Sequence, residues 1–188
     1  MSIKVMLRNV RLSYEHIFTP SAFEDNQDAK YSATFIIPKD HTDLPGLKRA
    51  MFEAGKETFA SDFTGTGWPK GYTCSLKDAD KDTDGSGEVL AEKNPAYKGC
   101  YILEANSVRR PLVVGRRKEA ITEEDGIIYS GCYVNASLGA AGYTYGKIKK
   151  GVKCYLNGVQ FVKDGERFGA NASDDFDELD GDEDDFMA

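Results

Sequence analysis

The sequence lacks the residue patterns that mark most catalytic sites. It contains two histidines, His16 and His41, and neither lies in a recognisable catalytic context. It has no G-x-S-x-G nucleophile pattern, no P-loop and no G-x-G-x-x-G turn that opens a helix after a strand. These absences argue against catalysis by a histidine-based triad or with a bound nucleotide. Neither an enzyme nor a cofactor is therefore expected.

Cysteine is scarce and widely spaced. The four cysteines are separated by 26, 32 and 22 residues and include no C-x-x-C pair: Cys74, Cys100, Cys132 and Cys154. With two histidines to supplement them, they do not form the ligand pattern of a zinc site. We expect no bound metal, and four reduced, mostly buried thiols in a cytosolic protein.

Long hydrophobic runs are also missing. No segment approaches the roughly 18 apolar residues that a membrane-spanning helix needs. The N-terminal stretch "MSIKVMLRNVRLSYEHIF" alternates polar and apolar residues and contains no continuous apolar core. We therefore expect neither a secretory signal peptide nor a membrane association.

The end of the chain lacks basic residues altogether. Residues 173–188 contain nine of the 31 Asp and Glu and none of the 24 Lys and Arg. The formal net charge of −7 therefore conceals a body, residues 1–172, with 24 basic and 22 acidic residues. This asymmetry predicts a body with an anion-binding surface and a tail that repels anions.

Two strands and one helix are predicted in the first half of the chain. Residues 3–14 alternate polar and apolar side chains, with a register break near Asn9. Residues 30–38 are rich in β-branched and aromatic side chains and stop at a proline. Apolar residues recur at helical spacing over residues 43–60, with Asp43 in the N-cap position.

The second half is predicted to be mainly β. Residues 61–98 are rich in Gly, Asp, Lys, Thr and Pro, which indicates long loops with short strands around residues 72–76 and 89–90. Four β-rich segments follow: "GCYILEANS", "RPLVVG", "GIIYSGCYVNASLG" and "GVKCYLNGVQFVKDG". This pattern favours an OB-like small β-barrel with one inserted helix. We expect one domain over residues 1–168 and a disordered acidic tail over 169–188.

One loop resembles a calcium-binding EF-hand but fails its most stringent requirement. Asp80, Asp82 and Asp84 take ligand positions 1, 3 and 5, with Gly85 at position 6. Position 12 requires a bidentate glutamate, yet it falls on Ala91. The segment is therefore interpreted as a solvated acidic loop.

Basic and aromatic residues gather in the second half of the chain, where seven of the ten tyrosines lie between residues 97 and 155. Bases of a single strand stack on aromatic side chains for about 1–3 kcal/mol each, whereas a duplex hides its bases. The pattern therefore favours single-stranded nucleic acid. The expected stacking groups are Tyr129, Tyr133, Tyr143 and Tyr145. The expected phosphate-binding residues are Arg109, Arg110, Arg116, Arg117, Lys147, Lys149 and Lys150.

Strand alternation within "GIIYSGCYVNAS" predicts that Tyr129, Gly131 and Tyr133 share one face, with the glycine leaving room for a flat ring. The opposite face would point into the core and carry Ile128, Cys132 and Val134. Packing on the sheet surface remains the alternative role for each tyrosine. Trp68 is either a further stacking group or a loop anchor.

If the body binds a polyanion, the acidic tail is expected to compete with that ligand for the basic surface. Its nine charges imitate phosphates, and tethering gives it a high effective concentration near a basic groove. A long single strand would displace the tail and free its apolar residues for partner proteins. A merely solubilising tail would explain the carboxylates but not the apolar residues. The expected partner-binding residues are Phe176, Leu179, Asp184, Asp185 and Phe186.

Several stretches resemble a family of bacteriophage single-stranded DNA-binding proteins with an OB-type core and an acidic C-terminal tail. They cover most of residues 8–169: "VRLSYEHIFTP", "KYSATFIIPKD", "NPAYKGCYILEANS", "IYSGCYVNAS" and "GVKCYLNGVQFVKDGERFG". The resemblance implies an accessory protein of replication or recombination that coats single strands without catalysis. In one departure from the family, Met187 and Ala188 follow Phe186, whereas many such tails end on the aromatic residue.

The sequence thus predicts a non-enzymatic, largely sequence-independent single-stranded DNA-binding protein in the cytoplasm of an infected bacterium. Its expected partners are single-stranded DNA and, through the tail, replication or recombination proteins, with a homo-oligomer left open. Two alternatives also stay open. One is a protein-interaction or structural phage component that does not bind nucleic acid. The other is a metal-dependent nuclease that uses the acids of residues 78–88.

Overall fold

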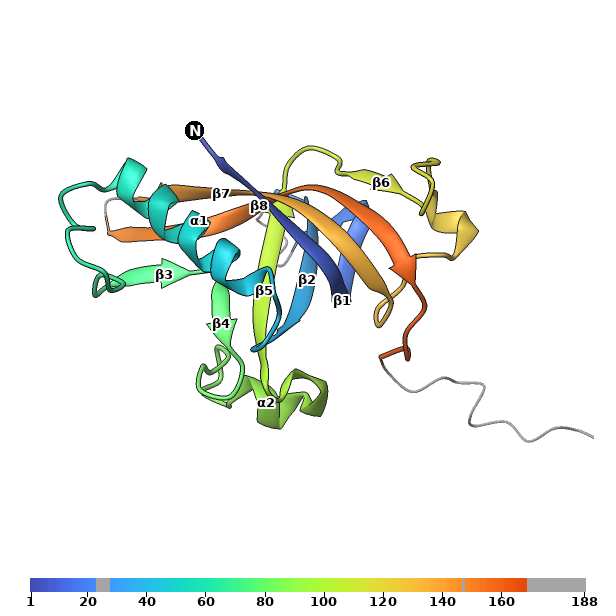
Figure 1. The fold of residues 1–188 in the computed structure, drawn as a ribbon, viewed down its shortest axis with the longest axis horizontal. Helices are drawn as coiled ribbons and strands as arrows, with labels where there is room; N and C mark the ends of the chain where they lie inside the picture. Colours follow the sequence, from blue (N-terminus) through green and yellow to red (C-terminus); the bar gives the residue numbers. More distant parts are fainter. Residues whose placement is uncertain (23–27, 147, 169–188) are drawn as a thin grey trace, which may run out of the picture.

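The computed structural model describes residues 1–22, 28–146 and 148–168 (Figure 1). A closed ring of five strands forms its centre. The strands of the ring are β1 (Ile3–Ser21), β2 (Lys30–Pro38), β5 (Cys100–Ser107), β7 (Tyr133–Tyr145) and β8 (Lys149–Lys163). Three short strands and four helical segments lie outside it: β3 (Tyr72–Cys74), β4 (Leu76–Asp78), β6 (Leu112–Val114), α1 (Leu44–Thr58), α2 (Leu90–Lys93), η1 (Pro95–Tyr97) and η2 (Glu123–Asp125).

The pairing of the strands is that of an OB-type barrel. β1 pairs antiparallel with β2 and β7, β2 pairs with β5, and β7 pairs with β8. A short parallel pairing of Ala105 with Cys154 and of Asn106 with Tyr155 joins β5 to β8 and closes the ring. The predicted mainly-β barrel with one main helix is therefore confirmed.

β2 has the predicted bounds, whereas β1 continues to Ser21, beyond the predicted residues 3–14. The side chains that alternate inward along β1 and β2, including Leu7, Leu12 and Phe35, are fully buried. The predicted register break is present, because the β1–β7 register shifts between Leu7 and Val10 and Asn9 has a φ of 54°. β2 ends at Pro38, which has no N–H to donate to a continued ladder.

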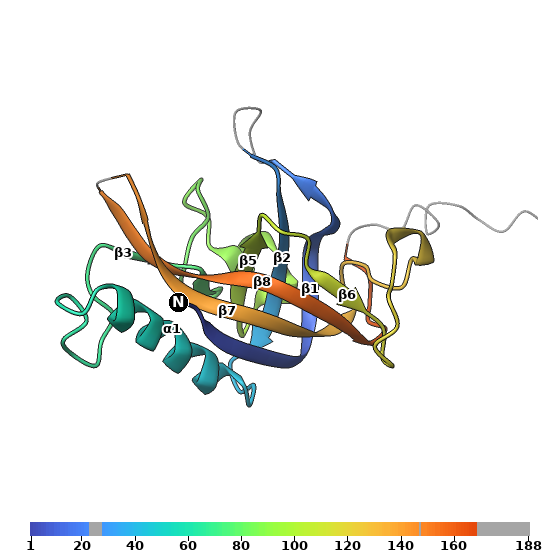
Figure 2. The ribbon, with the colours of Figure 1, turned by 90° about the horizontal axis from the view of Figure 1, so that it is seen from above.

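α1 covers one side of the barrel and packs against β7, β1 and β8 (Figure 2). Its buried face carries Leu44, Leu47 and Met51, at the spacing that predicted the helix. Asp43 occupies the N-cap position as predicted, although its side chain makes no capping hydrogen bond. Its carboxylate instead accepts a hydrogen bond from the backbone N–H of Arg8, at 2.9 Å, and so ties the helix to β1.

The segment between β4 and β5 builds a small second core on the outer surface of β2 and β5, where Ile36, Ala79, Tyr97 and Ile102 are buried together. The strand predicted around residues 89–90 is wrong. Val89 makes a single bridge to Thr83, and Leu90 begins α2.

The acidic loop is largely exposed to solvent, as predicted, and hydrogen bonds hold its carboxylates in place. Asp80 accepts hydrogen bonds from Lys39, at 2.6 Å, and from the backbone N–H of Gly99. Asp84 accepts from Ser86 and, at 2.7 Å, from Lys93, and these contacts hold the pKa of its carboxyl well below the usual range. Within the described residues, no three His, Cys, Asp or Glu side chains gather as a metal site would require. Nor does that part of the chain contain a helix long and apolar enough to cross a membrane.

The strand predicted over "GIIYSGCYVNAS" is wrong in its first half, because β7 begins at Tyr133. Ile128, Cys132 and Val134 are buried as predicted, but the chain before Tyr133 runs in turns, and Gly131 has a φ of 115°. Gly131 leaves room for the backbone of a later segment rather than for a ligand. A Cβ at this position would lie 2.0 Å from the carbonyl oxygen of Glu166.

Candidate nucleic-acid interface

β7 and β8 form a long hairpin that runs across the molecule (Figures 1 and 2). Several of the predicted basic and aromatic residues belong to this hairpin. Its ladder runs from the Tyr133–Lys163 pair to the Tyr145–Lys149 pair. At about 3.3 Å per residue, the ladder is on the order of 40 Å long. The other edge of β8 pairs in turn with β3, β5 and β6. Residues near either end of β8 are therefore far apart in space.

Three side chains meet on the outer surface of the hairpin beside β3, and we call Tyr143, Lys153 and Tyr155 the hairpin face. The Lys153 Nζ atom lies 5.3 Å from the centroid of the Tyr143 ring and 4.7 Å from that of the Tyr155 ring. Alternation along β8 explains this arrangement. Val152, Cys154 and Leu156 are buried in the barrel, so Lys153 and Tyr155 point outward.

A glycine in β8 allows the Tyr143 ring to reach this position. Tyr143 pairs with Gly151 across the ladder, and a Cβ at Gly151 would lie 2.9 Å from Cε1 of the tyrosine ring. The same Cβ would lie 2.3 Å from Oγ1 of Thr73 in β3. The Thr73 hydroxyl hydrogen-bonds the Tyr143 hydroxyl at 2.6 Å. The ring is therefore held from two sides before any ligand binds.

The surroundings of Lys153 disfavour the charged form of its side chain. It is half-buried, and within the described residues it forms no ion pair with a carboxylate. Burial lowers the pKa of its ammonium group below the usual value, and the nearby charge of Lys30 lowers it further. A bound phosphate would supply the missing negative charge and reverse this effect.

Exchange of Lys153 for methionine is expected to weaken nucleic-acid binding without destabilising the fold. Because the folded state lowers the pKa of Lys153, the charge costs stability throughout the pH range in which both states are protonated. This loss of stability fades only when the pH rises past the pKa of Lys153 in the folded state, because the folded protein then releases the proton. Lys153→Met should therefore give an unchanged or higher melting temperature in thermal denaturation. It should also lower the salt dependence of single-strand binding, whose logarithmic slope falls by about 0.7 per lost phosphate contact.

Lys163→Met is the matched control, since Lys163 lies 4.7 Å from the centroid of the Tyr133 ring at the far end of the same ladder. A melting temperature that falls more for Lys153→Met than for Lys163→Met would contradict this description of Lys153.

The four predicted stacking tyrosines do not form one surface. Tyr143 and Tyr145 lie near the β3 end of the ladder, where Tyr145 is 76% exposed. Tyr133 lies at the opposite end, beside Lys163. Tyr129 precedes β7. Its hydroxyl donates to Asp164, at 2.9 Å, and accepts from the backbone N–H of Gly165, while the Arg167 guanidinium lies 4.0 Å from its ring centroid.

The predicted basic residues are distributed along the whole of β8. Arg109 and Arg110 are exposed in the connection from β5 to β6, and Arg116 and Arg117 are exposed in the turn after β6. None of these four arginines forms an ion pair within the part of the chain that the structure describes. They are therefore available to an anionic ligand.

Lys149 and Lys150 begin β8 but point to opposite sides of it. Lys150 pairs with Asp62 at 3.3 Å, and this contact raises the pKa of the lysine, so its charge is already balanced. Lys149 is exposed and lies on the same side of the strand as Lys153. Lys147 and the predicted tail residues lie outside the described residues.

The residues predicted from the sequence to bind nucleic acid did not include Lys30, Lys153 or Tyr155. The alternation of "VKCYL" could have placed Lys153 and Tyr155 on one outward face, opposite the buried Val152, Cys154 and Leu156. The approach of Lys30 could not be read from the sequence, because it depends on the closure of the barrel.

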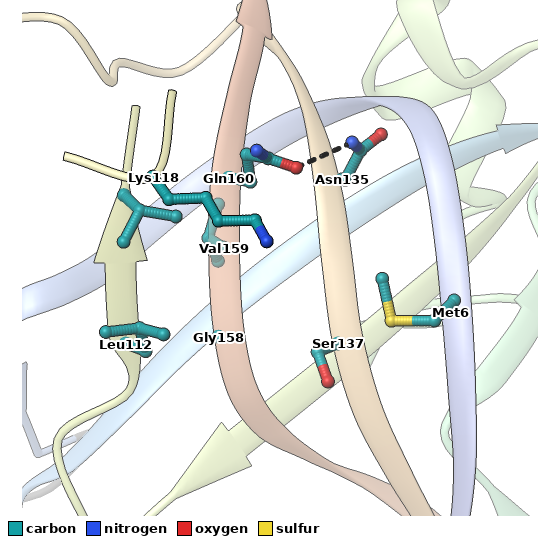
Figure 3. Close-up of a pocket in the computed structure, with 9 residues that line it drawn as sticks. Met6, Leu112, Lys118, Asn135, Ser137, Gly158, Val159 and Gln160 are labelled. Carbon is teal, nitrogen blue, oxygen red and sulfur yellow. Dashed lines mark hydrogen bonds between the residues drawn. The ribbon is translucent and has the colours of Figure 1, made fainter. Parts of the chain in front are cut away.

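A pocket in the sheet near β6 differs in its lining from the hairpin face (Figure 3). It has a volume of about 420 Å³, and its apolar lining includes Met6, Leu112, Val114 and Val159. Asn135 donates a hydrogen bond to Gln160 across it, at 3.0 Å. Its described lining includes one lysine and no aromatic ring, so it cannot act as a stacking surface.

Comparisons with known proteins identify the family and the fold of this chain. A family described as Enterobacter phage Enc34, ssDNA-binding protein, matches residues 3–187. Protein p50 of Acyrthosiphon pisum secondary endosymbiont phage 1 is 35% identical over 187 residues and covers 94% of each chain.

Among solved structures, the single-stranded DNA-binding protein of bacteriophage Enc34 in complex with ssDNA is similar at 27% identity and a TM-score of 0.71. The match covers 88% of this chain and 89% of that one. A single-stranded DNA-binding protein of bacteriophage T7 shares the fold at 14% identity and a TM-score of 0.60, with 96% and 98% of the two chains covered. The predicted resemblance is confirmed: this chain belongs to the family of the Enterobacter phage Enc34 ssDNA-binding protein.

Proposed function

We propose that this protein binds single-stranded DNA, largely independently of sequence, with the hairpin face as the centre of its binding surface. One observation carries the proposal: a half-buried lysine lies between two tyrosine rings and has no carboxylate partner among the described residues. Tyrosine rings offer stacking surfaces to bases of any identity, and the ammonium group offers a site for the phosphate between them.

The position of the hairpin face in the barrel supports this proposal. OB-type barrels bind oligonucleotides on the face of their second and third strands and on the loops between strands one and two and between strands four and five. Here the fourth and fifth strands are β7 and β8, and Lys30 opens the second strand, β2. From the hairpin face, a bound strand would continue along β8 toward Arg109 and Arg110. Tyr129, Tyr133, Arg116 and Arg117 would meet only a longer strand.

The tail has a regulatory role in this proposal. Its nine carboxylates would compete with DNA for the exposed cations, and its apolar residues would engage proteins of phage replication or recombination once DNA displaces them. These events would take place in the cytoplasm of the infected bacterium.

Salt dependence and tail removal together test the proposed function. The full chain and a version that ends at Ala172 would be titrated into a labelled oligothymidylate at low and moderate salt, with fluorescence anisotropy as the readout. This truncation removes none of the residues in the described elements, which end at Lys163. We expect binding that weakens steeply with salt and tightens on truncation. An absence of binding by both versions at low salt would reject DNA binding and favour a structural phage component.

The nuclease alternative has little support from the acidic loop. Asp80 and Asp84 each accept hydrogen bonds from a lysine and from backbone N–H groups, so these carboxylates are already occupied. Magnesium-dependent degradation of labelled DNA that is lost in Asp80→Asn would nevertheless establish that alternative.

A further inference from the structure

A pocket of about 500 Å³ lies between α1 and β3–β4, on the opposite side of β3 from the hairpin face. Thr73 of β3 contacts Tyr143 on the hairpin face, whereas the next residue, Cys74, lines the pocket. β3 is an edge strand of the described sheet, so a chain that leaves the hairpin face reaches the pocket by crossing one strand. The described lining comprises Lys48, Arg49, Met51, Phe52, Thr66, Trp68, Cys74, Leu76 and Tyr101.

Aromatic side chains form the walls of this pocket. Trp68 is held by its neighbours: its Nε1–H donates to the carbonyl of Tyr72, at 3.4 Å, and its ring packs edge-on against Phe63. It nevertheless remains 37% exposed, so part of its ring is open to a ligand. Tyr101 faces the pocket from β5, and Met51 and Leu76 contribute apolar surface. A flat, apolar ring fits such walls.

The rim of the pocket is basic. Lys48 and Arg49 are consecutive exposed residues of α1, no acidic residue belongs to the described lining, and neither cation forms an ion pair within the described residues. The Lys48 Nζ atom lies 4.0 Å from the centroid of the Tyr101 ring. Pockets of this volume that combine apolar walls with a few placed polar groups are typical of small-ligand sites.

We propose that this pocket receives a base of the bound single strand, with Trp68 as the stacking group and Lys48 and Arg49 on the adjacent phosphates. The inference rests on the proposed function and extends it to a second base-binding site across β3. The chemistry of the ligand follows from the lining: a flat heteroaromatic ring meets the aromatic walls, and an anionic group meets the rim.

Trp68 is the single tryptophan of the chain and therefore reports directly on its own pocket. The full chain would be titrated with an oligothymidylate while tryptophan emission and the anisotropy of a labelled strand are followed in parallel. We expect quenching that tracks binding, and an affinity about tenfold lower for Trp68→Leu and for the Lys48→Ala, Arg49→Ala pair. Lys56→Ala, an exposed change in the last turn of the same helix, is the matched control and should bind as the unaltered chain does.

The outcomes separate this inference from the proposed function. Binding by anisotropy with unchanged Trp68 emission, and with unchanged affinity of the Lys48→Ala, Arg49→Ala pair, would overturn the second site and leave DNA binding intact. A failure of the unaltered chain to bind would overturn both. Because Lys48 and Arg49 are exposed, their substitution keeps the test decisive even if Trp68→Leu unfolds.

Discussion

Replacement of Tyr143 and Tyr155 together by alanine is expected to weaken single-strand binding at least about 30-fold. Stacking contributes about 1–3 kcal/mol per base, so two lost platforms cost at least about 2 kcal/mol. The same change removes both rings that surround Lys153, and a phosphate would then meet a mobile ammonium group in water. Anisotropy titration with a labelled oligothymidylate at moderate salt measures the effect.

Two controls make this prediction specific. Tyr143→Phe with Tyr155→Phe keeps both rings and removes only the hydroxyls, including the hydrogen bond from Tyr143 to Thr73, and should bind nearly as well as the unaltered chain. Tyr133→Ala removes a tyrosine that also lies under a lysine, but at the far end of the ladder. If Tyr133→Ala lowers affinity as much as the double alanine variant does, the hairpin face is not the centre of binding.

Gly131→Ala is expected to destabilise the fold by about 2 kcal/mol or more. The φ of 115° at this residue is one that side chains other than glycine rarely adopt, which costs of order 1–3 kcal/mol. The added Cβ would also lie 2.0 Å from the carbonyl oxygen of Glu166, a backbone atom that cannot rotate away. The segment from Asp164 to Phe168 would have to move, and the hydrogen bond from Arg11 to that carbonyl, at 2.6 Å, would be lost.

Thermal denaturation tests this prediction, and a loss of about 2 kcal/mol corresponds to roughly 4–8 °C for a chain of this size. Gly126→Ala is the matched control. Gly126 also has a positive φ, of 61°, but an added Cβ would meet nothing within 4 Å. It should therefore show the backbone strain without the collision. Equal melting temperatures for the two variants would show that the collision with Glu166 is relieved at no cost.

Much of the barrel could be predicted from the sequence because its signals are local. Apolar and polar residues alternate along much of β1, where Leu7 and Leu12 are buried, and β2 ends at Pro38 because proline has no backbone N–H to donate. The start of β7 could not be predicted in this way. The alternation continues through Tyr129 and Gly131, but the backbone there bends to receive residues 164–168, which are far away in the sequence.

The candidate site was predicted only in part, for a similar reason. Composition pointed to Tyr143 and to the lysines near it, but it could not show that Asp62 already balances Lys150. It also gave Tyr129 the same weight as Tyr143, although the Tyr129 hydroxyl hydrogen-bonds Asp164 and the backbone of Gly165. The partners of a side chain depend on strand register and barrel closure, and these emerge only when distant segments pair.

Nuclear magnetic resonance tests most directly whether a single strand of DNA lies on the hairpin face. The full chain would be titrated with an oligothymidylate while the ring signals of its tyrosines are followed. We predict that the Tyr143 and Tyr155 signals shift together and saturate with binding, whereas Tyr129, fixed by Asp164 and Gly165, changes little. Saturable binding that leaves Tyr143 and Tyr155 unchanged would contradict the account.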